Sequence, residues 1–376
     1  MKNSNYSGGS MRVSHSRSGN RYITSSIIDD RRASAIAVIS AIMLLAVISC
    51  VFFLAFADDF TLPTWDEIFT TSSRQQGIKD PNKSYPYATN TSKTQFVASN
   101  GGTNLSSLGL YSQYAILISV DDMTTIGYKN ADEKIYPASM TKVMTVITAL
   151  DYIENLDEVY IATPEVLKTI PSGSSTASMK YVLDEYEINQ FTIRDLLYGI
   201  SYRSGADSVM CLLDHLGLTV SEFASLMNEK AKEIGLKNTH FGGAIGMDSE
   251  ENQTTCRDMA AIMAYAMENE YAREFFSGLS HHYDRYGSEY TYYHSTLANT
   301  VVQMDYSADT LLRGYTLIAA KSGLEDNAGY CLVSYIENDE TGEKYVLVTA
   351  KAERAEWPSA ANPINDMMTV FNGLKP

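Results

Sequence analysis

The chain has 376 residues and a formal net charge of −16 at pH 7, with 45% hydrophobic and 20% charged residues. This composition excludes an intrinsically disordered protein, and the length is sufficient for one or two domains with large cores. Residues 1–57 carry six basic and two acidic side chains, so residues 58–376 have a net charge of −20. Because such a domain repels polyanions, we expect no nucleic-acid partner.

The first 57 residues have the pattern of a membrane anchor. Residues 1–32 are rich in Ser, Asn and Arg without apolar periodicity, which predicts a disordered cytoplasmic tail. Residues 33–57 carry no charge and are long enough to span a bilayer. Since arginines precede this segment and aspartates follow it, the positive-inside rule places the rest of the chain outside the membrane. The alternative is a cleaved signal peptide, because Ala55-Phe56-Ala57 resembles a cleavage site, although the apolar part of a signal is usually about 7–15 residues long.

Residues 58–106 predict a linker between this anchor and a folded domain over residues 107–376. The segment is rich in Thr, Ser, Asn, Gly and Pro and lacks an apolar period, which is typical of an extended spacer. Residues 114–120 then form an apolar run with β-branched side chains that predicts the first strand. A second strand is expected near residues 125–128, after a turn at Asp121-Asp122.

The next stretch, Pro137-Ala138-Ser139-Met140-Thr141-Lys142, places a serine three residues before a lysine at the start of an apolar helix. Residues i and i+3 share one helix face, so the hydroxyl of Ser139 and the amine of Lys142 can meet. A serine needs an adjacent base to act as a nucleophile, and a lysine can be that base when burial lowers its pKa. This spacing alone is a weak signal, but Lys142 is the only lysine in the chain with a serine three positions before it.

The middle of the chain is predicted to be helical and its end to return to strands. Helical patterns cover residues 191–199, 206–216, 221–235 and 255–267. Ser221 is the expected N-cap of the third helix, which Gly235 ends. Strand patterns follow in residues 315–320, 330–335 and 345–350, before a final helix near residues 363–373. This order predicts an α+β fold, with one antiparallel sheet built from N- and C-terminal segments, flanking helices and an inserted helical lobe.

The sequence indicates neither a metal nor a cofactor. Three cysteines lie beyond residue 57, namely Cys211, Cys256 and Cys331, and their spacing does not resemble a disulfide framework, so we expect buried thiols. The pair His281-His282 lacks the ligand spacing of a metal site and is expected in a solvated loop. The tyrosines around it predict an amphipathic hairpin.

Two further motifs join the serine and lysine. Lys321-Ser322-Gly323 follows the expected strand at residues 315–320, and Ser204-Gly205-Ala206 lies in the turn between two predicted helices. The order of the three motifs resembles that of penicillin-recognising serine enzymes, whose serine is acylated by a D-alanyl peptide or a β-lactam. With Asn238-Thr239-His240-Phe241, the motifs over residues 107–350 are similar to those of serine-type D-alanyl-D-alanine carboxypeptidases, the low-molecular-mass penicillin-binding proteins.

This resemblance implies a serine transpeptidase and β-lactamase-like fold and a carboxypeptidase reaction. Ser139 would attack the carbonyl between two terminal D-alanines, Lys142 would take its proton, and Ser204 would relay a proton to the leaving amine. The implied substrate is a peptidoglycan stem peptide ending in D-Ala-D-Ala, with β-lactams as covalent inhibitors. The resemblance also implies a bacterial, Gram-positive cell membrane, crossed once, with the catalytic domain outside.

Four other residues are implied to bind the substrate. Lys321 and Ser322, followed by Gly323, would hold its terminal carboxylate through charge-assisted hydrogen bonds. The backbone N–H groups of Ser139 and Leu324 would form the oxyanion hole.

Ala206 departs from the family pattern, in which the third residue of this motif is asparagine. In relatives that carboxamide helps to position the substrate amide and the first-motif lysine. Its absence leaves open an enzyme of reduced or altered activity and a non-catalytic cell-wall-binding homologue. A β-lactamase is another alternative, because Glu185 and Asn189 resemble the Glu-x-x-x-Asn of class A enzymes, but they precede Ser204 instead of following it.

Overall fold

The computed structural model describes seven stretches within one compact unit, Thr71–Pro376: residues 79–80, 83–174, 190–277, 280–283, 291–294, 311–353 and 361–374. The predicted tail, the predicted anchor and the first part of the linker lie outside these residues. Within the described stretches no single helix is both long and apolar enough to cross a membrane. Two consecutive helices pass that test of length and composition only as a pair, and they are bent by 92°.

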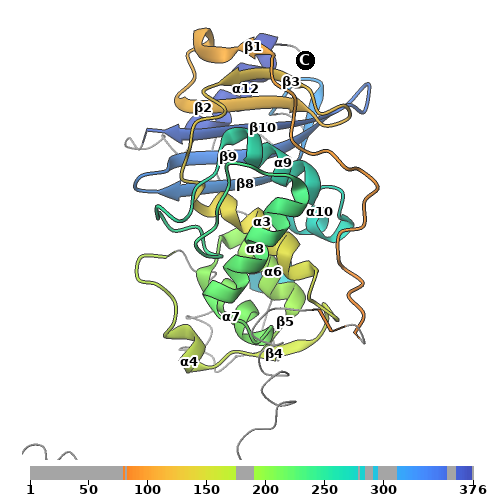
Figure 1. Cartoon of the computed structure of the whole chain (residues 1–376), viewed down its shortest axis with the longest axis vertical. Helices are drawn as coiled ribbons and strands as arrows, with labels where there is room; N and C mark the ends of the chain where they lie inside the picture. Colours follow the sequence, from red (N-terminus) through yellow and green to blue (C-terminus); the bar gives the residue numbers. More distant parts are fainter. Residues whose placement is uncertain are drawn as a thin grey trace, which may run out of the picture. The chain divides into compact units, whose positions relative to one another are not determined.

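Six strands form the main sheet, in the order β1-β3-β2-β10-β9-β8 (Figure 1). Their bounds are β1 Thr103–Asn104, β2 Ser112–Ser119, β3 Thr125–Lys129, β8 Tyr315–Glu325, β9 Gly329–Asn338 and β10 Lys344–Ala352. The antiparallel pairing of β2 with β10 joins the two ends of the domain into one sheet, as the sequence predicted. All neighbouring strands run antiparallel except β1 and β3, which are parallel.

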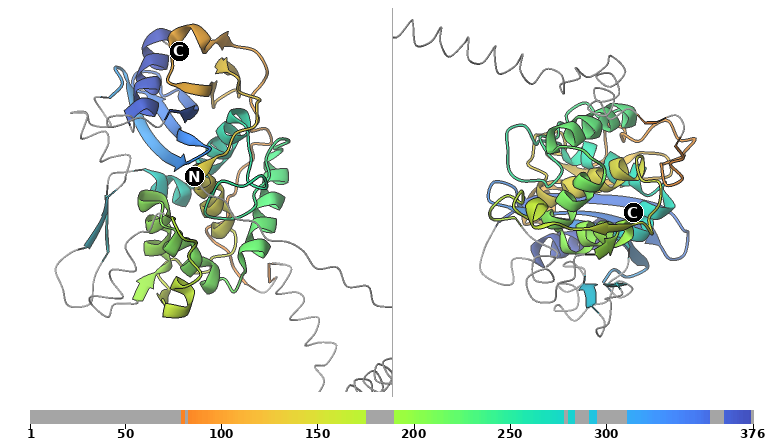
Figure 2. Two further views of the ribbon diagram at one scale, coloured as in Figure 1. Left: turned by 90° about the vertical axis from the view of Figure 1, so that its left-hand side faces the viewer. Right: turned by 90° about the horizontal axis from the view of Figure 1, so that it is seen from below.

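The two faces of this sheet belong to two separate cores. Along β2, Ile116 and Ile118 lie in the larger core, while Ala115 and Leu117 lie in the smaller one, because successive strand residues point to opposite faces. Helix α12 (Asn362–Leu374) covers the smaller core, and α9 (Cys256–Ala266) packs on the other face of the sheet (Figures 1 and 2). The helix predicted near residues 363–373 is therefore confirmed, and it shields one face of the sheet.

The helical lobe is inserted between β3 and β8 and is built around α3. Its helices are α3 Thr141–Leu150, α4 Pro164–Leu167, α6 Ile193–Arg203, α7 Ala206–His215, α8 Val220–Ile234 and α10 Glu270–Phe276. Two short antiparallel ladders accompany them, β4 Val159–Ile161 with β5 Gln190–Thr192 and β6 Ser280–Tyr283 with β7 Thr291–His294. Every residue of α3 is buried, because α6, α8 and α9 pack around it. The predicted hairpin is thus formed, with His281 and His282 in β6 and not in a loop.

The N-cap of α8 differs from the one expected. Thr219, and not Ser221, precedes the helix and accepts a hydrogen bond from the backbone N–H of Glu222. The Glu222 carboxylate in turn accepts from the backbone N–H of Thr219 at 2.8 Å, which completes a capping box. The helix ends at Gly235 in the left-handed conformation, as predicted.

Residues 83–101, here called the strap, pack along the domain. Phe96 is only 3% exposed and its ring meets that of Tyr265 edge to face at 5.0 Å. The carbonyl of Tyr87 accepts a hydrogen bond from Asn269 at 2.8 Å, and its ring lies 4.8 Å from that of Tyr271. The folded domain therefore begins upstream of the boundary that the linker composition suggested at residue 106.

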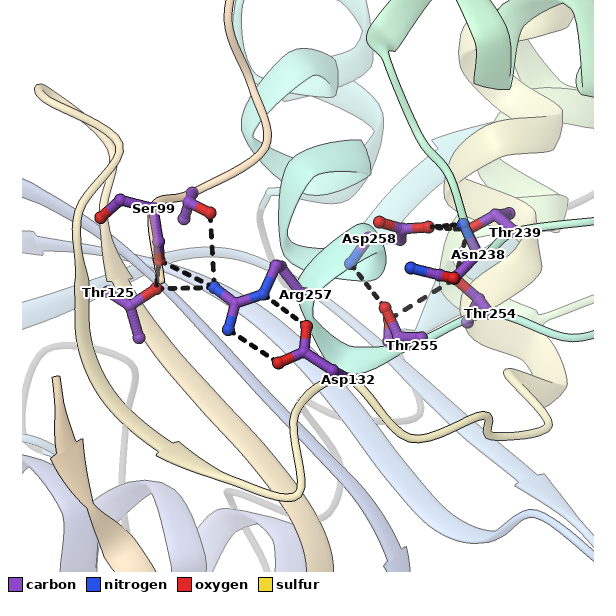
Figure 3. A network of polar contacts seen from close by, with 10 residues as sticks. Ser99, Thr125, Asp132, Asn238, Thr239, Thr254, Thr255, Arg257 and Asp258 are labelled. Atoms are coloured by element: carbon purple, nitrogen blue, oxygen red, sulfur yellow. Dashed lines mark hydrogen bonds and ion pairs between the residues drawn. The ribbon is translucent and has the colours of Figure 1, made fainter. Parts of the chain in front are cut away.

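Arg257 in α9 joins the strap to the sheet and to the loop after β3 (Figure 3). Its guanidinium donates to the carbonyl of Ser99 at 2.9 Å and to the Thr125 hydroxyl at 2.8 Å. It also forms a two-pronged ion pair with Asp132, at 2.6 and 3.0 Å, which lowers the pKa of that carboxyl. One buried side chain thus fastens three segments that are distant in sequence.

Within the described stretches the cysteines Cys211, Cys256 and Cys331 are buried free thiols, as predicted. Burial raises the pKa of Cys211 and of Cys331 to about 12, so neither thiol ionises near neutral pH. Since the thiolate is the reactive form, these side chains serve as small apolar core residues.

Candidate active site

Ser139 lies in a tight turn that leads into α3. The turn is the 3-10 helix η2 (Ala138–Met140), and Ala138 adopts a φ of 48°, which is uncommon for a residue other than glycine. Lys142 follows in the first turn of α3, and its Nζ lies 3.0 Å from Ser139 Oγ. The i, i+3 contact expected from the sequence is therefore formed.

Lys142 is held in an environment that favours the neutral amine. The side chain is 1% exposed, and burial lowers its pKa from 10.5 to about 7. The negative charges of Glu325 and Asp207 oppose part of this shift. A lysine with a pKa near neutrality can accept a proton from the adjacent hydroxyl, which is the property a general base requires.

Strand β8 brings the third motif against the turn that carries Ser139. Lys321 lies within this strand and not at its end, because β8 continues to Glu325, beyond the predicted limit of residue 320. It is 2% exposed, and its Nζ donates to the carbonyl of Ser322 at 2.7 Å. Burial, and the nearby charge of Lys142, lower the pKa of Lys321 well below its usual value. The two lysines of the motifs are therefore electrostatic neighbours.

Gly323 is the point of closest approach between β8 and the serine turn. A Cβ atom at this position would lie 3.0 Å from the carbonyl oxygen of Pro137 and 3.2 Å from the backbone nitrogen of Ser139. Contacts this short are rarely accommodated, so only glycine lets the strand come this near. The next residue, Leu324, has its side chain partly exposed.

Ser204 ends α6 in the left-handed conformation, with φ 57° and ψ 30°, and is buried. The turn it makes is continued by Gly205, whose N–H donates to the carbonyl of Gly199 at 3.0 Å. Helix α7 then starts at Ala206, which is fully buried. The second motif therefore lies on a tight α6–α7 turn, and α6 packs against α3.

Comparisons with known proteins agree with this arrangement. A family model for D-alanyl-D-alanine carboxypeptidase matches residues 102–352. The chain belongs to this family. Among curated relatives, D-alanyl-D-alanine carboxypeptidase DacF of Bacillus subtilis is 30% identical over 238 residues, which are 63% of this chain and 57% of that protein. DacC of Escherichia coli is 30% identical over 232 residues, or 60% of this chain and 53% of its own length. The chain thus spans a little over half of each.

Solved structures of the family confirm the fold. A mutant of a Streptomyces DD-transpeptidase superposes with a TM-score of 0.58 at 24% sequence identity, covering 70% of this chain and 97% of that one. A D-alanyl-D-alanine carboxypeptidase from Mycobacterium tuberculosis gives a TM-score of 0.55 at 18% identity, over 78% and 94% of the two chains. The penicillin-binding, α+β fold predicted from the motifs is therefore correct.

The family motifs did not reveal one hydrogen-bond partner of Lys142. The carbonyl of Ile245 accepts a hydrogen bond from Lys142 Nζ, and it comes from a loop about 100 residues further along the chain. The available signal was the cluster Gly242-Gly243-Ala244-Ile245-Gly246, since clustered glycines often mark a close approach of backbone. The Glu185 and Asn189 of the β-lactamase alternative lie outside the described residues.

Proposed function

We propose that the chain is a serine D,D-carboxypeptidase that removes the terminal D-alanine from peptidoglycan stem peptides through an acyl-enzyme on Ser139. The observation that carries this proposal is the 3.0 Å contact between the Ser139 hydroxyl and a buried Lys142 whose pKa is about 7. A serine hydroxyl beside a base whose pKa lies near the working pH is what acyl transfer at neutral pH needs.

In the first step Ser139 Oγ bonds to the carbonyl carbon between the two D-alanines, and its proton passes to Lys142. The carbonyl oxygen becomes an oxyanion, which the N–H groups of Ser139 and Leu324 stabilise. Ser204 passes a proton to the nitrogen of the leaving D-alanine as the C–N bond breaks, and regains one from Lys142, which becomes neutral again. Water then attacks the ester and gives a proton to Lys142, which returns it to Ser139 Oγ as the C–O bond breaks and the shortened peptide is released.

Lys321 and Ser322 bind the carboxylate of the terminal D-alanine in this proposal. Burial and the nearby charge of Lys142 lower the pKa of Lys321 in the free site. A bound carboxylate raises that pKa again, since an opposite charge favours the ammonium form. Substrate binding therefore favours the charged form of Lys321, and the resulting ion pair is specific for a peptide with a free carboxyl end.

Labelling with a fluorescent penicillin tests this function. The full-length protein should form one covalent adduct, which mass spectrometry should locate on Ser139, and Ser139→Ala should abolish it. Ser201→Ala is a matched control, because Ser201 is a buried serine of α6 that donates to the carbonyl of Tyr198. An adduct on another residue contradicts the assignment.

Ala206 favours a second candidate, a cell-wall-binding homologue without catalysis. The position lacks the carboxamide that the family motif carries, and it is fully buried in the first turn of α7. Absence of both a penicillin adduct and D-alanine release, with retained binding to peptidoglycan, would support this candidate. Rapid hydrolysis of the penicillin itself would instead identify a β-lactamase.

We also propose that the catalytic domain lies outside the cell membrane, held by residues 33–57, with residues 1–32 in the cytoplasm. The support is the uncharged run of 25 residues and the arginines that precede it. Protease added to intact cells should digest the domain. Full protection in sealed cells, followed by digestion once they are opened, would refute this topology.

A further inference from the structure

A loop crosses beside the start of α3 and supplies backbone oxygens to it. Residues 241–253 form this loop, here called the α3 loop, and its base is closed by paired hydrogen bonds between His240 and Gln253. The Thr145 hydroxyl of α3 donates to the carbonyl of Ala244 at 2.7 Å. Lys142 donates to the next carbonyl, that of Ile245. These two hydrogen bonds therefore hold the α3 loop against the turn of α3 that carries Lys142.

Gly246 shows how closely the α3 loop approaches the helix entrance. It has a φ of 88°, and a Cβ at this position would lie 2.1 Å from the carbonyl oxygen of Ala138. The same Cβ would lie 3.0 Å from the Cβ of Thr141. No side chain larger than hydrogen fits there, so the backbone of the loop is pressed onto the turn that carries Ser139.

Asn252, near the end of the α3 loop, makes another contact between the loop and α3. Its side chain is 3% exposed, and its Nδ2 lies 3.3 Å from the carbonyl of Met247 and 3.5 Å from the hydroxyl of Thr141. A backbone carbonyl can only accept, so the amide nitrogen and not the oxygen must face Met247. Thr141 is fully buried and is the residue directly before Lys142. Asn252 thus links the loop to α3 on one side of Lys142, while Ile245 contacts the lysine itself.

We propose that Asn252 is a positioning residue for Lys142: it keeps the α3 loop seated on α3, so that the Ile245 carbonyl stays on the amine and water stays out. The inference rests on the proposed function, in which Lys142 is the base.

The charges around Lys142 decide the direction of the expected effect. Glu325 and Asp207 raise its pKa, and burial outweighs both carboxylates. Lys321 is the neighbouring buried lysine, whose own pKa is lowered by burial and by Lys142. Loosening the α3 loop rehydrates the amine, which removes the dominant cause of the low pKa. The pKa of Lys142 then rises from about 7 towards its usual 10.5.

The test compares the acylation rates of full-length Asn252→Ala and of the unchanged protein across pH. If the pKa rises by about one unit, the fraction of neutral lysine falls about fivefold at pH 7 but hardly at all at pH 9. We therefore expect a rate loss of about fivefold at pH 7 that is recovered at pH 9. Thr141→Val should produce the same shift, and the double variant should add little to either. An equal loss at both pH values, or an unmoved pH midpoint, overturns the proposal.

Ser249→Ala is the matched control on the same loop. The Ser249 hydroxyl is exposed and accepts the backbone N–H of Glu251 at 3.2 Å, away from α3. Its rate profile should match that of the unchanged protein. If Ser249→Ala shifts the pH profile as much as Asn252→Ala does, then truncation of any side chain in the loop has this effect. That result would refute the specific role of Asn252.

A second readout separates this inference from the proposed function. The difference in unfolding free energy between each background and its Lys142→Met form depends on pH through the pKa of Lys142 and its coupling to Lys321, without catalysis. In the Asn252→Ala background this difference should change over a higher pH range than in the unchanged protein. If the unchanged protein forms no acyl-enzyme, the proposed function fails, whereas the positioning of Lys142 is still decided by this comparison.

Discussion

Replacing Lys142 by methionine should inactivate the protein and make it more stable. Methionine has a similar length and no charge, so it fills the same buried space. Keeping an amine at a pKa of about 7 in place of 10.5 costs the fold about 4 kcal/mol at pH 7, at about 1.4 kcal/mol for each pKa unit. Loss of the hydrogen bonds from Lys142 to Ser139 and Ile245 reduces this gain in stability by about 1–3 kcal/mol. The net gain should be about 1–3 kcal/mol, or a rise in Tm of roughly 2–10 °C.

The sign of the pH dependence follows from the direction of the shift. Because the pKa of Lys142 is lower in the folded state, the unfolded chain binds more protons between about pH 7 and 10.5, and the stability of the unchanged protein rises with pH in that window. The advantage of Lys142→Met should therefore shrink by about 2 kcal/mol between pH 7 and 9. Chemical denaturation of both full-length proteins at several pH values measures this difference in the free energy of unfolding.

The exposed lysine Lys134 supplies the control for net charge, as Lys134→Met removes one positive charge without touching the buried site. Its effect should stay small at every pH. Two results would contradict the argument: a lower stability of Lys142→Met, or a stability gain that is the same at pH 7 and pH 9. Either would show that desolvation of the amine is not the largest contribution of Lys142 to the free energy of unfolding.

Three further outcomes are expected. The rate of penicillin acylation should rise with pH through about 7, and Glu325→Gln should move the midpoint to lower pH, because that carboxylate raises the pKa of Lys142; an unchanged midpoint in stopped-flow assays would contradict this. Ala206→Asn should raise kcat/KM on a D-Ala-D-Ala peptide roughly 2- to 13-fold, the value of one neutral hydrogen bond, whereas a loss in the same assay would show that the pocket has closed around alanine. Gly323→Ala should slow acylation at least about tenfold with the circular-dichroism spectrum retained, since the added methyl meets Pro137 and Ser139 N; full activity would mean that β8 can move away freely.

The sequence was most informative where one short segment holds both partners of a contact. Ser139 and Lys142 are a turn apart in one helix, so their meeting follows from helix geometry alone. The capping box of α8 was equally local, and the choice of Ser221 over Thr219 missed a Thr-x-x-Glu signal that was available. The apolar run with β-branched side chains at residues 114–120 likewise predicted β2.

What the sequence could not supply were contacts between distant segments that use the backbone. The Ile245 carbonyl has no side-chain signature, because any residue can offer its carbonyl. The strap was mistaken for linker since its anchoring residues, such as Phe96, are isolated apolar side chains without a period. Its partners Tyr265 and Arg257 lie more than 150 residues away and could not be paired with it from composition.

The strap also determines which contacts resist a pulling force applied to the chain that precedes it. Lys83 pairs with Glu154, and Lys79 lies within 3.7 Å of Asp151, so the incoming chain is first gripped just beyond the carboxyl end of α3. A pull on the chain before residue 79 is therefore resisted along the whole length of residues 83–101, and does not peel the two-residue strand β1 from the edge of the sheet. By the same reasoning, a soluble fragment cut at residue 107 would lose the burial of Phe96 and the carbonyl that Arg257 holds, whereas one that begins before residue 79 keeps the domain intact.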